Sequence, residues 1–195
     1  MVRIYERVVV YDYHKYTLLL VKLWTSIQMN VNSAKIPVLA SRLDLSEVSA
    51  SINALPSVGA VAFPCLNVPE ANALVSLVDQ LEYRPAKAIT GSEKAPVYQD
   101  FDLCYDVPSE HSLWDFAKVL EVALTSALAG AEVDSAGCPV RLNDLIVQRY
   151  PPGCTGITPH RDHVRYGFLI AIVLLTGDGY FGICDDRKGS ESKEI

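Results

Sequence analysis

The segment that most limits the possible folds is GITPHRDHVRYGFLIAIVLLTG, residues 156–177. Its second half, Phe168–Leu175, is an uninterrupted apolar run. The run is too short to cross a bilayer, which takes about 20 residues, but it has the length of a buried strand. Proline and glycine precede the segment in PPGCTG, and glycine follows the run in TGDG. The pattern predicts a core strand, with His160, Asp162 and His163 shortly before its start.

The composition is that of a folded, acidic chain. Half of the 195 residues are hydrophobic, so a sizeable core can form. Lys and Arg number 17 against 23 Asp and Glu, which gives a net charge of −6. This balance disfavours non-specific binding to nucleic acids or to anionic membranes. It favours a small molecule or a protein side chain as the substrate.

The cysteines and the N-terminus indicate where the protein resides. The five cysteines are scattered and form no CxxC pair, which is typical of free thiols in a reducing compartment. The first residues carry both acidic and basic side chains and do not resemble a secretory signal. We therefore expect a cytoplasmic protein without a transmembrane helix.

The pattern along the chain predicts an α+β fold. Residues 1–55 are expected to form an N-terminal extension, and residues 56–195 the main domain. Two amphipathic helices are expected at 69–83, where Pro69 and Glu70 favour the first turn, and at 109–129, with Ser109 as the N-cap. Strands are expected in the segments VGAVAFPCL, FDLCYDV, LNDLIVQRY and YFGICD, besides the apolar run.

The candidate metal ligands are His160 and Asp162. In an extended backbone, residues two apart point to the same face, so the imidazole and the carboxylate would lie side by side. They are two of the three ligands of a 2-His-1-carboxylate facial triad, the arrangement of non-haem iron(II) oxygenases. His163 would point to the opposite face from Asp162, which favours a solvent-facing or supporting position.

The segments LIVQRYPPGCTGITPHRD and FLIAIVLLTGDGYFGI resemble the iron(II)- and 2-oxoglutarate-dependent dioxygenases, in particular the AlkB-like branch. The shared pattern is a polar-Arg-Tyr triplet at a strand end, a Pro-Gly turn, a His-x-Asp pair and a hydrophobic strand. It covers about residues 143–184. More loosely, the segment from Val58 to Leu81 looks like the strand and helix that precede this pattern in such enzymes.

The resemblance implies a double-stranded β-helix, or jelly-roll, core with the two helices packed outside it. It implies Fe(II) held by His160 and Asp162, and 2-oxoglutarate as cosubstrate in contact with Tyr150 and Gln148, where Gln148 replaces the usual Asn. No catalytic residue beyond the metal ligands is implied. The activity would be hydroxylation or oxidative demethylation of an unknown substrate.

The sequence also departs from this family. A distal His and an Arg that anchors 2-oxoglutarate are expected further on, but no histidine follows His163, and the basic residues after Arg165 are Arg187, Lys188 and Lys193. The barrel is therefore expected to be incomplete. On that basis we expect residues 1–195 alone to bind Fe(II) weakly and to turn over no 2-oxoglutarate.

Three other interpretations stay open. His160 can be a histidine at the edge of a barrel, hydrogen-bonded to Asp162 without metal. The chain can be a non-catalytic remnant of the fold or a binding module. The segment TPHRDH also differs from the HxHxDH of metallo-β-lactamase-like hydrolases by having Thr158 in place of the first His, which removes a zinc ligand. A serine hydrolase is disfavoured because the sequence has no G-x-S-x-G.

Overall fold

A computed structural model describes residues 8–11, 17–22, 45–129, 140–161, 169–177, 181–184, 186, 188 and 193–194. These residues form three helices, α1 (Leu45–Val58), α2 (Val68–Val78) and α3 (Ser112–Ala129). Their strands are β1 (Val8–Tyr11), β2 (Thr17–Lys22), β3 (Ala60–Pro64), β4 (Arg84–Pro85), β5 (Ile89–Ser92), β6 (Ala95–Asp100), β7 (Asp102–Cys104), β8 (Val147–Arg149), β9 (Gly156–His160), β10 (Leu169–Val173), β11 (Phe181–Cys184) and β12 (Lys193–Glu194).

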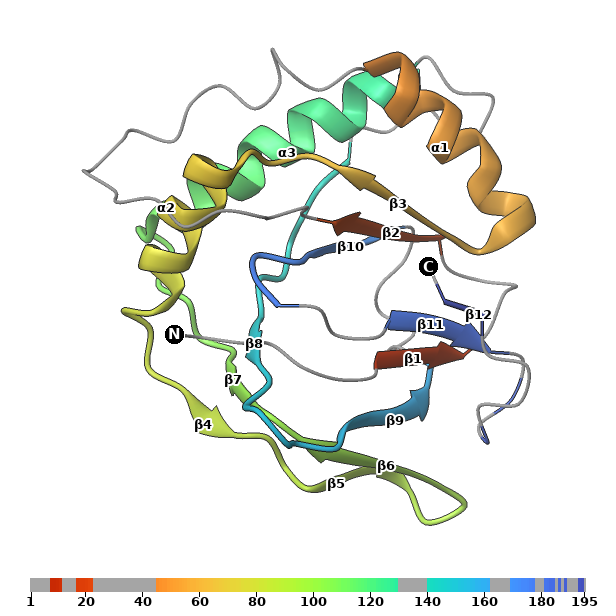
Figure 1. The fold of residues 1–195 in the computed structure, drawn as a ribbon, viewed down its shortest axis with the longest axis vertical. Coiled ribbons are helices and arrows are strands. Elements are labelled where there is room, and N and C mark those ends of the chain that lie inside the picture. The colour runs from red at the N-terminus through yellow and green to blue at the C-terminus, as the bar shows by residue number, and fades with distance from the viewer. Residues whose placement is uncertain are drawn as a thin grey trace.

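The strands form three sheets, so the expected α+β class is confirmed (Figure 1). The largest sheet has the order β12-β11-β1-β9-β6-β5, and the two smaller sheets have the orders β10-β2-β3 and β4-β7-β8. The β10-β2-β3 sheet is parallel throughout, and β1 runs parallel to both β9 and β11. No helix in the described part of the chain is long and apolar enough to cross a membrane.

The β10-β2-β3 sheet lies between the helices and the largest sheet (Figure 1). Side chains alternate along β10 as strand geometry requires. Leu169, Ala171 and Val173 pack toward the helices, whereas Ile170 and Ile172 pack with Phe181 of β11. The apolar run is thus a core strand, as expected, and it separates two hydrophobic clusters.

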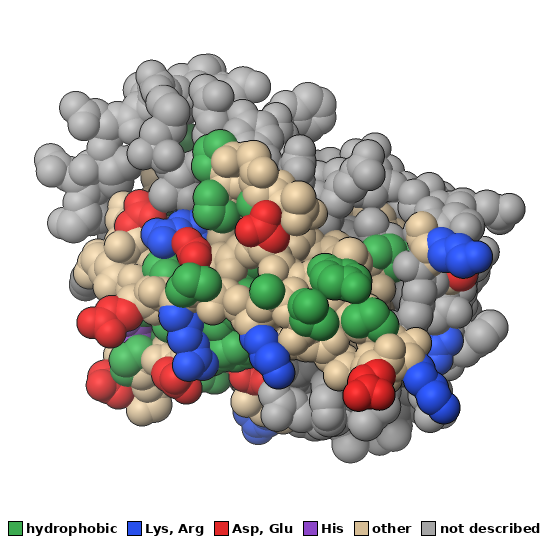
Figure 2. Space-filling model, turned by 90° about the horizontal axis from the view of Figure 1, so that it is seen from below, with side chains coloured by type: hydrophobic (Ala, Val, Ile, Leu, Met, Phe, Trp, Pro, Cys, Tyr) green, Lys and Arg blue, Asp and Glu red, His purple; other side chains and the backbone are tan. Residues whose placement is uncertain are grey.

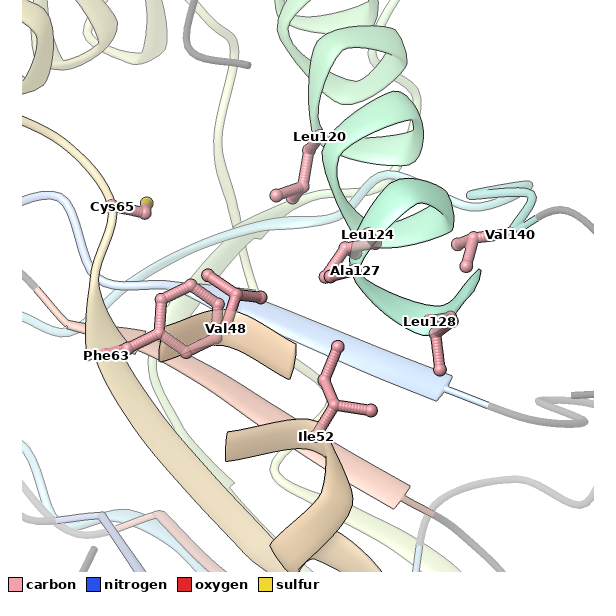
Figure 3. Close-up of a cluster of buried hydrophobic side chains, with 9 residues drawn as sticks. All are labelled: Val48, Ile52, Phe63, Cys65, Leu120, Leu124, Ala127, Leu128 and Val140. Carbon is pink, nitrogen blue, oxygen red and sulfur yellow. The ribbon is translucent and has the colours of Figure 1, made fainter. Parts of the chain in front are cut away.

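The cluster on the helix side is the best buried part of the protein. Its nine buried side chains come from α1, α3, β3 and the segments beside them (Figure 3): Val48, Ile52, Phe63, Cys65, Leu120, Leu124, Ala127, Leu128 and Val140. The Ser49 hydroxyl also donates a hydrogen bond to the Ala127 carbonyl at 2.9 Å, which joins the two helices.

Helix α2 begins one residue earlier than expected and ends sooner. Asn67 is its N-cap, and Asn67 and Glu70 form a capping box in which each side chain accepts the other's backbone N–H. The helix ends at Val78, although the apolar spacing continues to Leu81. The predicted end at residue 83 is wrong, because spacing reports which residues face the core and not where helical hydrogen bonding stops.

Helix α3 begins at Ser112, and the prediction that Ser109 caps it is wrong. The Ser109 hydroxyl instead bonds the neighbouring Glu110 carboxylate. His111 takes the capping position, since its Nδ1 accepts the Leu113 backbone N–H at 3.3 Å. The sequence pattern favours Ser109 because hydroxyl residues are common N-caps, and it does not indicate that the His111 imidazole takes this position.

Two strands lie outside the segments in which the sequence pattern predicts strands. Strands β5 and β6 form a hairpin in which Ile89 pairs with Tyr98 and Ser92 with Ala95. Gly91 has a φ of +80°, and a Cβ built there would lie 2.3 Å from the Ala95 carbonyl oxygen, so this position requires glycine. The short, alternating pattern AITGSEKAPVYQ is the signal that could have predicted the hairpin.

The N-terminal strands pair with strands from distant parts of the chain. Strand β1 lies between β9 and β11, and β2 lies between β10 and β3. Helix α1, which runs from Leu45 to Val58, crosses the expected boundary at residue 55. The division of the chain at residue 55 stays a prediction, although these pairings join both sides of that boundary.

The thiols that the structure describes are free and buried. They are Cys65, Cys104, Cys154 and Cys184. Cys138 lies outside the described residues. Burial, followed by the charge of Glu70, raises the pKa of the Cys65 thiol to about 12. Cys65 is therefore protonated at neutral pH and packs as a small hydrophobic side chain.

Candidate metal centre

Strand β9 positions the histidine of the predicted metal site. His160 is the last residue of this strand and is half-buried. The entry to the strand is fixed by Asp100, whose carboxylate accepts both the backbone N–H of Thr155 at 2.7 Å and its hydroxyl at 3.2 Å. Strand β9 also pairs with two neighbours, β6 and β1. His160 therefore extends from a supported strand and not from a free loop.

A β-bulge lies directly before His160. In the pairing with β1, Val8 lies opposite Ile157 and Val10 lies opposite His160, so two steps of β1 match three steps of β9. Pro159 has no backbone N–H to donate to a neighbouring strand, which suits it to the irregular position. On the other side, the Tyr98 backbone N–H donates to the Thr158 hydroxyl at 3.0 Å.

The bulge changes the direction of the His160 side chain. In a regular strand, residues three apart, such as Ile157 and His160, would point to opposite faces. One extra residue restores them to the same face. Ile157 packs in a buried cluster with Tyr150 and Phe101. The register therefore favours a position of the imidazole on the same side of β9 as Ile157, which packs with Tyr150.

The hydrogen bond of the imidazole selects its tautomer. Nδ1 of His160 lies 2.9 Å from the Thr158 carbonyl oxygen. A carbonyl oxygen only accepts, so Nδ1 is the donor in this bond, and in the neutral imidazole the lone pair then lies on Nε2. Metal-binding histidines commonly donate one ring N–H to a carbonyl or carboxylate and use the other nitrogen for the metal. The bond from Nδ1 of His160 to the Thr158 carbonyl is of this kind.

The remaining predicted ligand, Asp162, lies outside the described residues. His163, which is not a predicted ligand, lies outside them too. Within the ranges that the structure describes, no group of three or more His, Cys, Asp or Glu side chains is placed to hold a metal ion. Of the two predicted ligands, the structure therefore describes only His160. A complete set of metal ligands would need side chains from the undescribed segments.

Tyr150 and Gln148, the predicted 2-oxoglutarate contacts, lie together. The Tyr150 hydroxyl donates to the Gln148 side-chain oxygen at 3.0 Å. Tyr150 is buried and its ring lies 4.9 Å from that of Phe101, whereas Gln148 is exposed. Burial raises the pKa of Tyr150 above its ordinary value, and nearby Cys154 adds to the effect. The hydroxyl is thus a hydrogen-bond donor at neutral pH, and its position is fixed.

Arg149, between these two residues, faces the other way. Its guanidinium bonds the Asp102 carboxylate at 3.1 Å and lies 4.1 Å from the centre of the Tyr83 ring. Burial raises the pKa of Tyr83 to about 12, against a lowering effect of Arg149. The sequence alone indicates no partner for Arg149. The period-2 alternation does place its side chain on the opposite face of the strand from those of Gln148 and Tyr150.

Comparisons with known proteins do not identify a relative. No protein-family model, no curated protein and no solved structure matches this chain. The resemblance to iron(II)- and 2-oxoglutarate-dependent dioxygenases therefore depends on the motif residues and on the geometry around His160.

Proposed function

We propose that this protein is an iron(II)- and 2-oxoglutarate-dependent dioxygenase that hydroxylates or oxidatively demethylates its substrate. The observation that carries the proposal is the bulge at Thr158 and Pro159. The register favours a position of His160 on the face of Ile157, and the bond from Nδ1 to the Thr158 carbonyl orients the imidazole. The bulge supports the proposal because β-bulges are over-represented next to active sites, where they change the direction of a side chain.

Each of the proposed site residues has a defined task. His160, through Nε2, and the Asp162 carboxylate would hold Fe(II), and the third protein ligand would come from outside the described residues. Tyr150 and Gln148 would orient 2-oxoglutarate beside the metal. The bound iron would supply the activation of dioxygen and the oxidative decarboxylation of 2-oxoglutarate. The Thr158 carbonyl keeps the imidazole in the required tautomer and orientation.

A jelly-roll core is part of the proposal. Two sheets facing each other across Ala60, Ile170, Ile172 and Phe181 support it, because a jelly roll consists of two packed sheets. Strands of a jelly roll are antiparallel, whereas β1 and β2 pair in parallel with their neighbours. The jelly-roll interpretation therefore concerns β9, β10 and β11, which in the described sheets are joined to their neighbours through β1 and β2 and do not pair with one another.

The proposed substrate is a small molecule or a protein side chain. On the described part of the face shown in Figure 2, Lys and Arg side chains are interspersed with acidic and hydrophobic ones. Tight, non-specific binding to a nucleic acid needs a continuous basic surface. The mixed charge on this face and the net charge of −6 both favour a substrate without a phosphate backbone.

The second candidate is a non-catalytic binding module. It is favoured by the lack of a three-residue metal group among the described residues. Release of succinate from 2-oxoglutarate in the presence of Fe(II) and dioxygen would establish the oxygenase, although residues 1–195 alone are expected to release none. Only the oxygenase releases succinate, whereas a binding module can still bind Fe(II) through His160.

The direct test of the site is anaerobic Fe(II) titration by calorimetry. We expect weak binding that is lost in His160→Ala and in Asp162→Ala. The matched control is His111→Asn, which removes another imidazole but retains a side chain able to cap α3. If Fe(II) binds His160→Ala and His111→Asn equally well, the proposed site is wrong.

A further inference from the structure

The hairpin β5–β6 leaves one edge of the largest sheet open. Strand β5 is the last strand in the order β12-β11-β1-β9-β6-β5, and no strand among the described residues pairs with its outer side. It lies at the border of the molecule (Figure 1). An open edge presents backbone N–H and C=O groups to which a further strand can add. The outer side of β5 is therefore a surface on which another chain can pair.

The backbone of Ile89 faces this open side. The Ala88 carbonyl accepts the Gln99 backbone N–H at 2.9 Å, so the hydrogen-bonding groups of Ala88 point toward β6. Successive residues of an antiparallel strand direct these groups to alternate sides. The N–H and C=O of Ile89 therefore point away from β6, toward the position of an added strand.

An exposed apolar pair lies beside the same edge. Ile89 pairs with Tyr98 across the hairpin, and the two side chains are 51% and 53% exposed. Single exposed apolar residues are common on protein surfaces, but these two occupy directly opposite positions and so form a continuous patch. A strand that adds to β5 would cover the Ile89 side chain and remove part of this patch from water.

The charges around β5 are complementary to those of a second copy. Lys87 lies three residues before Thr90, and Glu93 lies three residues after it. If two copies of β5 pair antiparallel about Thr90, Lys87 of each copy lies opposite Glu93 of the other. Both charged side chains are exposed. A shift of one residue would instead place Lys87 opposite Ser92 or Lys94, so the charge pattern selects the register centred on Thr90.

We propose that β5 pairs with β5 of a second copy of this chain, antiparallel and centred on Thr90. Odd-numbered positions then pair with odd-numbered ones, so the outward-facing backbone groups of the two strands meet. Ile89 of each copy lies opposite Gly91 of the other, where no side chain opposes it, and the two Ile89 side chains are diagonal neighbours. Because β5 has only four residues, the interface is small and the dimer is weak.

The test is sedimentation velocity of the whole chain from about 10 µM to about 1 mM, the range that suits a small interface. The variants are Lys87→Glu, Glu93→Lys and the double variant Lys87→Glu/Glu93→Lys. We expect the dimer Kd to rise about tenfold in each single variant, because both ion pairs become contacts between like charges. The double variant exchanges the charges and should return to the wild-type Kd.

A mixture and a control make the test specific for this register. An equimolar mixture of the two single variants should dimerise like the wild type, because opposite charges then face each other at both ends. Lys94→Glu makes the same charge change as Lys87→Glu at an exposed position of the adjacent turn, and its Kd should stay within about twofold of the wild-type value. Circular dichroism checks that all variants fold.

Three results would overturn the proposal. One is a wild-type protein that stays monomeric over the whole concentration range. Another is a dimer whose Kd changes equally in Lys87→Glu and Lys94→Glu, or in neither. The third is a mixture of the two single variants that dimerises no better than each variant alone. None of these results involves Fe(II), so they are distinct from failure of the proposed function.

Discussion

The helix-covered cluster and the strands around His160 differ in how completely they are buried. In the helix-covered cluster (Figure 3), Leu124 is 1% exposed and Ala127 is 0% exposed. All five residues of β10 are only half-buried, as is His160 at the end of β9. The first region obtains its stability from close packing. In the second region the strands are fixed by hydrogen bonds in which the Thr158 hydroxyl and the Asp100 carboxylate accept backbone N–H groups.

This difference separates stability from binding. Changes in the helix-covered cluster should lower the free energy of unfolding without altering metal affinity in molecules that stay folded. Changes around β9 should lower the metal affinity and have little effect on the free energy of unfolding, because that region contributes less buried apolar area. The predictions below test this separation.

The largest expected effect is that of Leu124→Ala. It removes a fully buried side chain from the helix-covered cluster and should lower the free energy of unfolding by about 2–5 kcal/mol. Urea denaturation followed by circular dichroism measures it. Ile172→Ala, in half-buried β10, is the comparison and should cost clearly less. Equal losses would show that the two regions are packed alike.

A smaller effect is expected from Thr158→Val. The valine keeps the shape but leaves the Tyr98 backbone N–H without its acceptor, at a cost of about 1 kcal/mol. Because the bulge then loses its cross-strand hydrogen bond, Fe(II) affinity should fall about tenfold. Thr158→Ser retains the hydroxyl and should retain the affinity. A Thr158→Val protein with wild-type Fe(II) affinity would show that the bulge does not orient His160.

The smallest effect concerns alkaline pH. The pKa of Cys65 is raised from 9.0 to about 12 in the folded protein, so folding disfavours the thiolate. The resulting stability is fully present below pH 9 and is lost as the pH rises from 9 toward 12. Urea denaturation at pH 7 and pH 10 should give a smaller decrease for Cys65→Ala than for wild type. Identical decreases would show that this thiol titrates normally in the folded state.

Much of the fold follows from the sequence. Apolar spacing predicts the helices and the apolar run predicts β10, because burial requires a period of 3.6 or 2 residues. Helix ends are less predictable. The His111 cap and the end of α2 at Val78 depend on hydrogen bonds that spacing does not report. Apolar spacing does not predict the hairpin β5–β6, because its strands are short and most of their residues are exposed.

The candidate site is less predictable than the fold. The motif indicates which residues are candidates, and it joins Tyr150 to Gln148 through their spacing of two. It does not report the bulge, which depends on pairing with β1, about 150 residues earlier in the chain.

The measurement that tests the central claim most directly is a titration of the isotope-labelled protein with Mn(II), followed by NMR. A bound paramagnetic ion broadens the amide signals near it. We predict that signals of Ile157, Thr158 and His160 broaden first, while those of Val48 and Leu124 in the helix-covered cluster stay sharp. The broadening should disappear in His160→Ala. Unchanged broadening in His160→Ala, or broadening confined to residues away from β9, would contradict a metal centre at His160.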